Sequence, residues 1–268
     1  MSYSTFNELL FPALPLELRE EIYRYLVFPT SKPRRRGGHK LHPHHVLVGM
    51  ASSHGFHCYQ LPSLCALNKP TYYEVGLFFI RNVEFRMLGY QGAINLTRLL
   101  DTFPGEQGFA AVRRLSFERW LAGHTAVRDV EEGVPLMKRC TGLSELGLRL
   151  TCSNLITTPM LYFQAMEDRE TSEDHLMTLE EVVRRHRFEE ILELRSLNKL
   201  FLDVFRFMRL AYFRDFFESV LIDCMPLMQE LAEWLRRGFS ARGMRVEVIV
   251  MESTDEGLSG FWSDRSTG

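Results

Sequence analysis

Histidine and cysteine side chains gather in one stretch of the N-terminal part of this 268-residue chain, and these are the residue types that could hold a metal ion. Neutral imidazoles and thiolates are good zinc ligands, and a loop can wrap around an ion. No pair of them has the spacing of a known zinc module, however, and histidine-rich tracts are often simply solvated. We therefore expect no metal site and no cofactor. The residues concerned are His39, His42, His44, His45, His54, His57, Cys58 and Cys65.

The sequence motifs that mark common enzymes do not occur in this chain. It has no glycine-rich dinucleotide or Walker loop, no HExxH zinc motif and no CxxC pair. The segment from Gly142 to Gly147 resembles a nucleophile elbow but has one spacer too many, and Ser144 is better explained as the start of a strand. We expect a protein that is not an enzyme.

Basic side chains cluster in the same N-terminal stretch, where no acidic residue occurs between Glu21 and Glu74. Such a run can be a nuclear localisation signal or can contact phosphates. The whole chain has a net charge of −2, which gives no wider support for nucleic-acid binding. We expect a basic localisation or interaction loop, and we consider nucleic acid a poor candidate partner. Its residues are Lys32, Arg34, Arg35, Arg36 and Lys40.

Several features of the sequence bear on its compartment. The N-terminus lacks a basic segment followed by an apolar run, so we expect no secretory signal. No stretch approaches about 18 uncharged apolar residues, so we expect no contact with a membrane. The five scattered cysteines are most simply reduced thiols. We expect an intracellular protein of the cytoplasm, the nucleus or both.

A short amphipathic helix is predicted from Leu14 to Leu26. Pro15 suits the first helical position, because its missing N–H has no partner there in any helix. Leu18, Ile22 and Leu26 recur every four residues and therefore share one face. Taken alone, this pattern favours a first helix that packs its apolar face onto its own domain.

The residues of this helix resemble a known family. The run LPLELREEIYRYL is similar to the opening of the F-box-like domains of filamentous fungi, which read L-P-x-E-L-R-x-x-I-[YW]. Residues 64–75 resemble the second block of that family, and residues 77–85 resemble the aromatic segment that follows it. Three blocks occur in the family's order, although a basic, histidine-rich insertion separates the first from the second.

The resemblance implies a function that the residue types alone do not indicate. It implies that the first helix docks a Skp-type adaptor of a cullin–RING ubiquitin ligase, while the later part of the chain holds a substrate protein. The docking residues would be Leu14, Pro15, Leu16, Leu18, Ile22 and Leu26. The alternative is a fungal interaction or assembly subunit, nuclear or chromatin-associated, in which the F-box-like fold has no ligase function.

The remaining two-thirds of the chain alternate strand-like and helical segments. Three segments share the pattern apolar-x-x-apolar-x-apolar, at 112–117, 143–148 and 197–202, and a β-branched strand follows at 246–251. Helices are predicted at 94–103, 134–140, 179–194 and 213–239. Alternation of this kind predicts αβ units with a largely parallel sheet.

The fold class that follows is α/β (mixed α+β): an N-terminal helical F-box-like module and then irregular leucine-rich-repeat-like αβ units. The leucines at 115, 146 and 200 are spaced more widely than the repeats of about 20–29 residues in a true solenoid. We expect an F-box-like module over 1–90 with a disordered or loop insertion at about 29–60, an αβ recognition domain over 91–252 and a flexible tail over 253–268.

Overall fold

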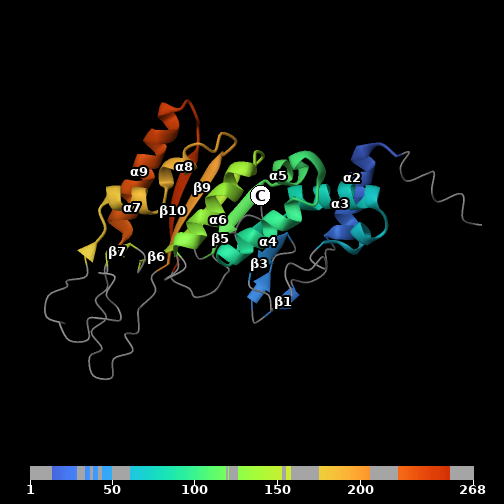
Figure 1. The fold of residues 1–268 in the computed structure, drawn as a ribbon, viewed down its shortest axis with the longest axis horizontal. Helices are drawn as coiled ribbons and strands as arrows, with labels where there is room; N and C mark the ends of the chain where they lie inside the picture. Colours follow the sequence, from blue (N-terminus) through green and yellow to red (C-terminus); the bar gives the residue numbers. More distant parts are fainter. Residues whose placement is uncertain are drawn as a thin grey trace, which may run out of the picture.

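The computed structural model describes residues 14–28, 34–36, 39–41, 44–49, 61–118, 120, 126–152, 155–157, 175–205 and 223–253. Helix α2 (Leu16–Val27) begins directly after Pro15. A 3₁₀ turn, η2 (Ser63–Ala66), leads into α3 (Lys69–Asn82). Helices α2 and α3 pack against each other at one end of the molecule (Figure 1).

Helix α3 begins where the sequence supplies a cap. The side chain of Asn68 accepts a hydrogen bond from the backbone N–H of Thr71 at 2.9 Å. This contact satisfies one of the N–H groups that the first turn of a helix leaves unpaired. Pro70 lies in that first turn, where the missing N–H of proline does no harm.

Six strands form one parallel sheet. They are β3 (His45–Val48), β4 (Glu84–Met87), β5 (Arg114–Phe117), β6 (Glu145–Thr151), β9 (Lys199–Phe205) and β10 (Glu247–Ser253). Their order across the sheet is β10-β9-β6-β5-β4-β3, so each strand lies beside the one that follows it in the chain. The predicted αβ alternation and the parallel sheet are therefore confirmed.

The crossover helices lie along one side of the sheet (Figure 1). They are α4 (Tyr90–Leu100), α5 (Gln107–Ala111), α6 (Ala126–Arg139), α7 (Leu179–Arg185), α8 (Phe188–Ile191) and α9 (Met225–Ala241). Right-handed crossovers between strands in monotonic order place every helix on the same face. The helix predicted at 179–194 divides into α7 and α8 around Arg187, which has a left-handed φ of 55°. Of the helix predicted at 213–239, residues 213–222 lie outside the described part.

The structure also contains a 3₁₀ turn and two short antiparallel strand pairs. A 3₁₀ turn, η3 (Pro104–Glu106), precedes α5. Strands β1 (Arg34–Arg36) and β2 (His39–Leu41) form an antiparallel pair, and so do β7 (Ile156–Thr157) and β8 (His175–Leu176).

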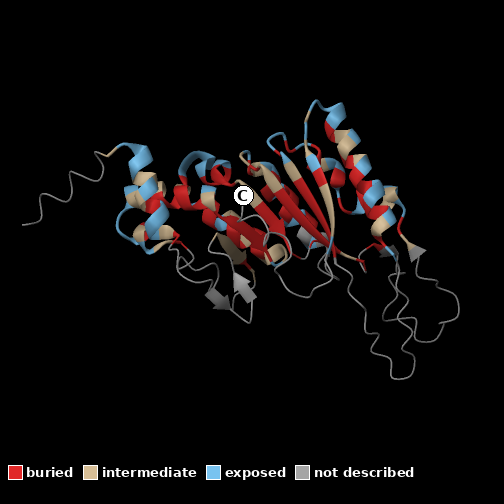
Figure 2. Cartoon of the chain, turned by 180° about the vertical axis from the view of Figure 1, so that it is seen from behind, coloured by how far each residue is buried: buried red, intermediate tan, exposed pale blue. Residues whose placement is uncertain are grey.

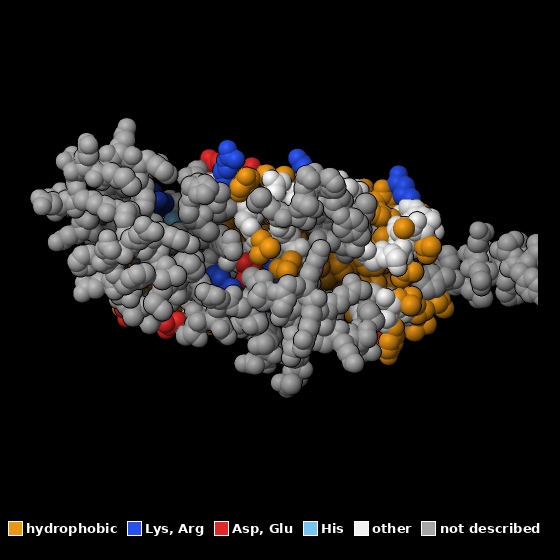
Figure 3. Space-filling view, turned by 90° about the horizontal axis from the view of Figure 1, so that it is seen from below, with side chains coloured by type: hydrophobic (Ala, Val, Ile, Leu, Met, Phe, Trp, Pro, Cys, Tyr) orange, Lys and Arg blue, Asp and Glu red, His pale blue; other side chains and the backbone are white. Residues whose placement is uncertain are grey.

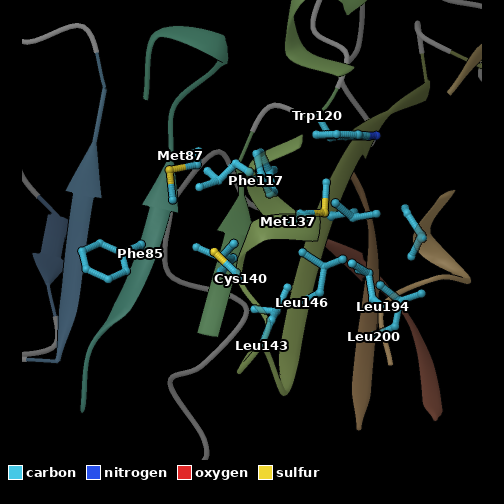
Figure 4. Close-up of a cluster of buried hydrophobic side chains, with 14 of the residues drawn as sticks. Phe85, Met87, Phe117, Trp120, Met137, Cys140, Leu143, Leu146, Leu194 and Leu200 are labelled. Carbon is cyan, nitrogen blue, oxygen red and sulfur yellow. The ribbon is translucent and has the colours of Figure 1, made fainter. Parts of the chain in front are cut away.

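The core lies between the sheet and its helices (Figure 2). Strand register aligns Phe85, Leu115, Leu146 and Leu200 in one transverse row of buried side chains. Met137 of α6 and Cys140, which directly follows this helix, are buried in the same cluster (Figure 4). The shared pattern of the three predicted strands is thus explained, because their leucines are the residues that face the helices.

The insertion predicted as a disordered region or loop at 29–60 contains three strands, β1, β2 and β3. Residues 45–48 form β3, which pairs with β4 in the main sheet. The sheet therefore runs across the expected boundary between residues 90 and 91, because β3 and β4 belong to it as much as β5 does. The sequence did not predict this strand, because its surroundings are rich in histidine and only the Val46-Leu47-Val48 segment is apolar.

Strand β10 ends at Ser253, and the rest of the tail predicted over 253–268 lies outside the described residues. None of the helices in the described ranges combines the length and the apolar character that crossing a bilayer requires.

Candidate functional site

Helix α2 turns its apolar stripe away from α3. Leu18, Tyr25 and Leu26 are 53%, 69% and 58% exposed, and Ile22 is half-buried. At 100° per residue these four side chains share one side of the helix. Single exposed leucines are ordinary on protein surfaces, but an apolar stripe on one helix indicates a contact surface. We call these four residues the outer face of α2.

The opposite side of α2 attaches the helix to the molecule. Tyr23 is the buried residue of this helix, and its ring lies 5.7 Å from that of Phe78 on α3, centroid to centroid. Burial, and then the neighbouring carboxylate of Glu74, raise the pKa of Tyr23 to about 12. The phenol is therefore neutral at physiological pH.

Two ion pairs border this contact between α2 and α3. Arg19 pairs with Glu74, and Arg81 of α3 lies 3.4 Å from Glu20. At 100° per residue, Glu20 lies opposite the outer face, whereas Tyr23 and Arg19 lie on the flank next to Leu26. The fold therefore holds α2 without using Leu18, Tyr25 or Leu26.

The other residues predicted for docking lie at the start of α2. Leu14 is half-buried and precedes the helix, Pro15 is its exposed N-cap residue, and Leu16 is 47% exposed. Tyr25 was not among the predicted docking residues, although it has the largest exposed fraction of the outer face. Its position seven residues after Leu18 was the signal, since residues at i and i+7 share a helix face.

The predicted basic loop is only partly described. Arg34, Arg35 and Arg36 form β1 and Lys40 lies in β2, with Arg35 opposite Lys40 in the register of this hairpin. The side chains of these residues, and Lys32 as a whole, lie outside the described part. The hairpin is thus seen as backbone alone.

The candidate zinc ligands do not converge among the described residues. His44 Nδ1 lies 3.1 Å from the Asn82 carbonyl oxygen, and its ring packs on Phe28. Burial raises the pKa of the Cys65 thiol to about 11, which opposes the thiolate that zinc requires. Within the described ranges, no group of three histidine, cysteine or acidic residues could hold a metal ion. The side chains of His39, His42, His54, His57 and Cys58 lie outside those ranges.

A second feature, which the sequence did not lead us to expect, lies on the face of the sheet opposite the helices. A chain of ionic contacts begins at His45 on β3, whose Nε2 lies 3.3 Å from Glu84 Oε2. Glu84 Oε1 accepts a hydrogen bond from Arg86 Nε at 3.0 Å, and Arg86 Nη1 lies 3.6 Å from Glu118 Oε1. Glu118 directly follows β5. These contacts join three neighbouring strands.

The series of ionic contacts continues across the next two strands. Arg149 Nη1 on β6 lies 3.0 Å from Glu118 Oε2, and Arg149 Nε donates to Asp203 Oδ2 on β9 at 2.6 Å. Apart from His45, whose side chain is 12% exposed, these side chains are at most 7% exposed. We call the chain of contacts from His45 to Asp203 the ionic row.

Burial of the ionic row raises the pKa of two of its carboxyl groups, those of Glu84 and Glu118. Desolvation raises the pKa of Glu84 to about 7, although Arg86 opposes the shift. Desolvation also raises the pKa of Glu118, with Arg86 and Arg149 opposing it. Charged groups are retained in such positions chiefly when they are paired, and perturbed carboxyl groups are concentrated at functional sites.

A signal for the ionic row existed in the sequence. Single charged residues alternate with apolar ones in Glu84-Phe85-Arg86-Met87, and they interrupt the apolar runs at Arg149 and Asp203. Alternation with a period of two places such residues on the face opposite the leucines. The sequence-based predictions used only the apolar residues of each strand, which share one face.

Comparison of the chain with models of protein families, with curated proteins and with solved structures finds no match. The mixed α/β fold, the outer face of α2 and the ionic row therefore provide the basis for the functional argument.

Proposed function

We propose that this chain is a non-catalytic F-box-like adaptor, in which α2 docks a Skp-type adaptor protein and the leucine-rich-repeat-like αβ sheet domain holds a substrate protein for a cullin–RING ubiquitin ligase. The observation that carries the proposal is the outward orientation of Leu18, Tyr25 and Leu26 on a helix whose sequence resembles the F-box signature. If these apolar side chains were buried against the rest of the molecule, they could not bind a partner.

The geometry of α2 suits recognition of a helix by a groove. Such complexes depend on apolar anchors at positions i, i+4, i+7 and i+8 of one helix, which Leu18, Ile22, Tyr25 and Leu26 supply. Burying an exposed leucine contributes about 1.5–3 kcal/mol, and a few such anchors dominate an interface. The exposed outer face is therefore large enough in energetic terms to support a specific complex.

The proposed mechanism is proximity. The adaptor would hold the N-terminal end of the molecule while the sheet domain holds the substrate, and the ubiquitin-transfer chemistry would belong to other subunits. This division requires no cofactor, metal or catalytic residue in this chain. Its setting would be the cytoplasm or the nucleus.

The experiment is a pull-down of the purified chain with a purified Skp-type adaptor from the same organism. Wild type should be retained, while Leu18→Asp and Tyr25→Asp should reduce retention at least about tenfold, since each places a charge on an apolar interface. The matched control is Leu88→Asp, an exposed leucine at the end of β4, which should leave retention unchanged.

Circular dichroism and thermal unfolding would establish that each variant is folded. Folded wild type that is not retained would overturn the ligase proposal and leave the interaction subunit as the alternative. Equal loss of retention in Leu88→Asp would show that the outer face of α2 is not the docking surface.

A further inference from the structure

We propose that β10 is the docking site for a second copy of this chain, through antiparallel pairing of the two β10 strands about Val250. One sheet then runs through both copies. Docking at this edge is independent of adaptor docking at α2. Figure 3 shows hydrophobic side chains at the end of the molecule that α2 and α3 form, whereas β10 lies toward the opposite end (Figure 1).

Strand β10 forms one edge of the main sheet. It has β9 as a neighbour on one side, and no strand of the described ranges pairs with its other side. Natural proteins commonly blunt such edges with short strands, proline or charged residues. In contrast, β10 has seven residues, no proline and the uncharged run Ile249-Val250-Met251 at its centre. These three residues are only half-buried, so another strand can reach this edge.

The outer edge of β10 presents backbone groups for hydrogen bonding. The Glu247 N–H donates to the carbonyl of Asn198, on the β9 side. Backbone groups alternate between the two sides of a strand, so those of Val248 and Val250 point away from β9. The Val248 carbonyl confirms this direction, because it accepts a hydrogen bond from Arg236 Nη2 of α9 at 2.7 Å. No described residue pairs with the outward N–H and carbonyl of Val250.

Two-fold symmetry determines how two copies of this edge meet. A strand that pairs with its own copy about a two-fold axis runs antiparallel to it. With the axis at Val250, the two Val250 residues exchange both of their backbone hydrogen bonds. Ile249 of each copy then lies opposite the partner's Met251. These apolar side chains meet on the face opposite the helices, because Val250 itself packs on the core side.

The charges along the edge favour a second copy over an unrelated strand. In the same register, Val248 lies opposite the partner's Glu252, whose side chain is exposed. Arg236 reaches the Val248 carbonyl, so its guanidinium would lie beside that carboxylate. A carbonyl oxygen has two lone pairs, so Arg236 keeps its hydrogen bond while the partner's Glu252 N–H donates to the same oxygen. Two-fold symmetry forms this complementary contact twice.

The test is sedimentation velocity of the purified full chain over a range of protein concentrations. Wild type should dimerise with a dissociation constant on the order of 10 μM or tighter. Val250→Pro removes an N–H that points away from β9, so it should weaken the dimer at least about tenfold without the loss of a hydrogen bond to β9. The matched control is Val250→Thr, which keeps the N–H and the branched shape and should change the dissociation constant less than about twofold.

Charge substitutions test the register of the two strands. Glu252→Arg places a like charge beside the partner's Arg236 and should weaken the dimer at least about fivefold. Adding Arg236→Glu to this variant should restore most of the affinity, because the two charges are then exchanged. Leu18→Asp, on the outer face of α2, should leave the dimer unchanged, which separates this edge from adaptor docking.

Hydrogen exchange of wild type gives a readout that does not depend on the folding of a variant. Protection in 247–253 should increase with protein concentration. Circular dichroism and thermal unfolding would establish that each variant is folded. Wild type that stays monomeric at about 100 μM would overturn the proposal and leave this edge to an extended segment of another protein. Equal weakening by Val250→Thr, or a dimer that Leu18→Asp disrupts and Val250→Pro does not, would also overturn it.

Discussion

Arg149 donates a hydrogen bond from Nε to Asp203 Oδ2 over 2.6 Å, and this contact joins the neighbouring strands β6 and β9 inside the molecule. The same guanidinium contacts Glu118 at 3.0 Å. Arg149 therefore compensates Asp203 and shares the compensation of Glu118 with Arg86, and the stability of the sheet should depend on it.

The first prediction concerns Arg149→Ala. Removing one partner from a buried ion pair leaves an uncompensated charge and costs about 3–5 kcal/mol. We expect a loss of this size in the free energy of unfolding, measured by urea denaturation at pH 8. At pH 5 the loss should be smaller, because burial raises the pKa of the Glu118 carboxyl group, which is then more readily protonated.

Lys199→Ala provides the matched control for this prediction. Lys199 pairs with Glu247 at 3.4 Å across β9 and β10, but both side chains are substantially exposed. Exposed pairs contribute about 0–1 kcal/mol. If Arg149→Ala cost no more than Lys199→Ala, the ionic row would not stabilise the sheet.

The second prediction concerns the pH dependence of stability. The folded state raises the pKa of Glu84 from 4.5 to about 7, so between these values it binds more protons than the unfolded state. The contribution of this group is therefore fully present below pH 4.5 and is lost as pH rises through 7. A shift of this size corresponds to about 3 kcal/mol.

Glu84→Gln isolates this effect from those of the other carboxyl groups. The variant keeps the shape of the side chain but cannot ionise, so its free energy of unfolding should fall less than that of wild type between pH 5 and pH 8. Urea denaturation at four pH values in that range provides the comparison. Parallel pH profiles would show that Glu84 titrates at its ordinary pKa.

The sequence predicted the arrangement of the sheet well, because the strand leucines face the helices and repeat in one pattern. Leu115, Leu146 and Leu200 are all fully or almost fully buried, as expected. The ionic row escaped prediction for a physical reason: a lone charge in an apolar strand resembles a solvent-facing residue. Only the register between strands shows that Glu118, Arg149 and Asp203 lie side by side.

The orientation of α2 could not be predicted either. A period of 3.6 residues shows which side chains share a face, but not which face is turned toward the molecule. Here Tyr23, on the more polar side, is buried against α3, and Leu18 on the apolar side is exposed. Ion pairs of Arg19 and Glu20 with α3 favour this orientation, and their partners lie more than 50 residues away in the sequence.

The third prediction concerns the cap of α3. Asn68→Ala removes the acceptor that pairs with the Thr71 N–H and should cost about 1 kcal/mol of stability. Asn68→Asp keeps an acceptor and should retain most of it. Thermal unfolding of the three proteins tests the cap, and equal destabilisation by both substitutions would show that the amide group itself is needed.

The fourth prediction concerns the basic insertion, which the structure divides into two parts. Deleting residues 31–57 would remove β3, including Val48, which is 1% exposed. Burial of a valine contributes about 1.5–3 kcal/mol, and the hydrogen bonds of β3 to β4 would be lost as well. We expect this deletion to destabilise or unfold the chain, as measured by thermal unfolding.

Deleting residues 31–42 should have a different result. It removes the β1–β2 hairpin with Lys32, the three arginines and Lys40, but it leaves β3 in place. The rings of Phe28 and His44 lie 4.2 Å apart, centroid to centroid, so the remaining Pro29, Thr30 and Pro43 have only a short gap to span. Stability should therefore stay within about 1 kcal/mol of wild type. If the basic residues form a nuclear localisation signal, a fluorescent fusion of this variant should lose nuclear accumulation, whereas unchanged accumulation would exclude that role.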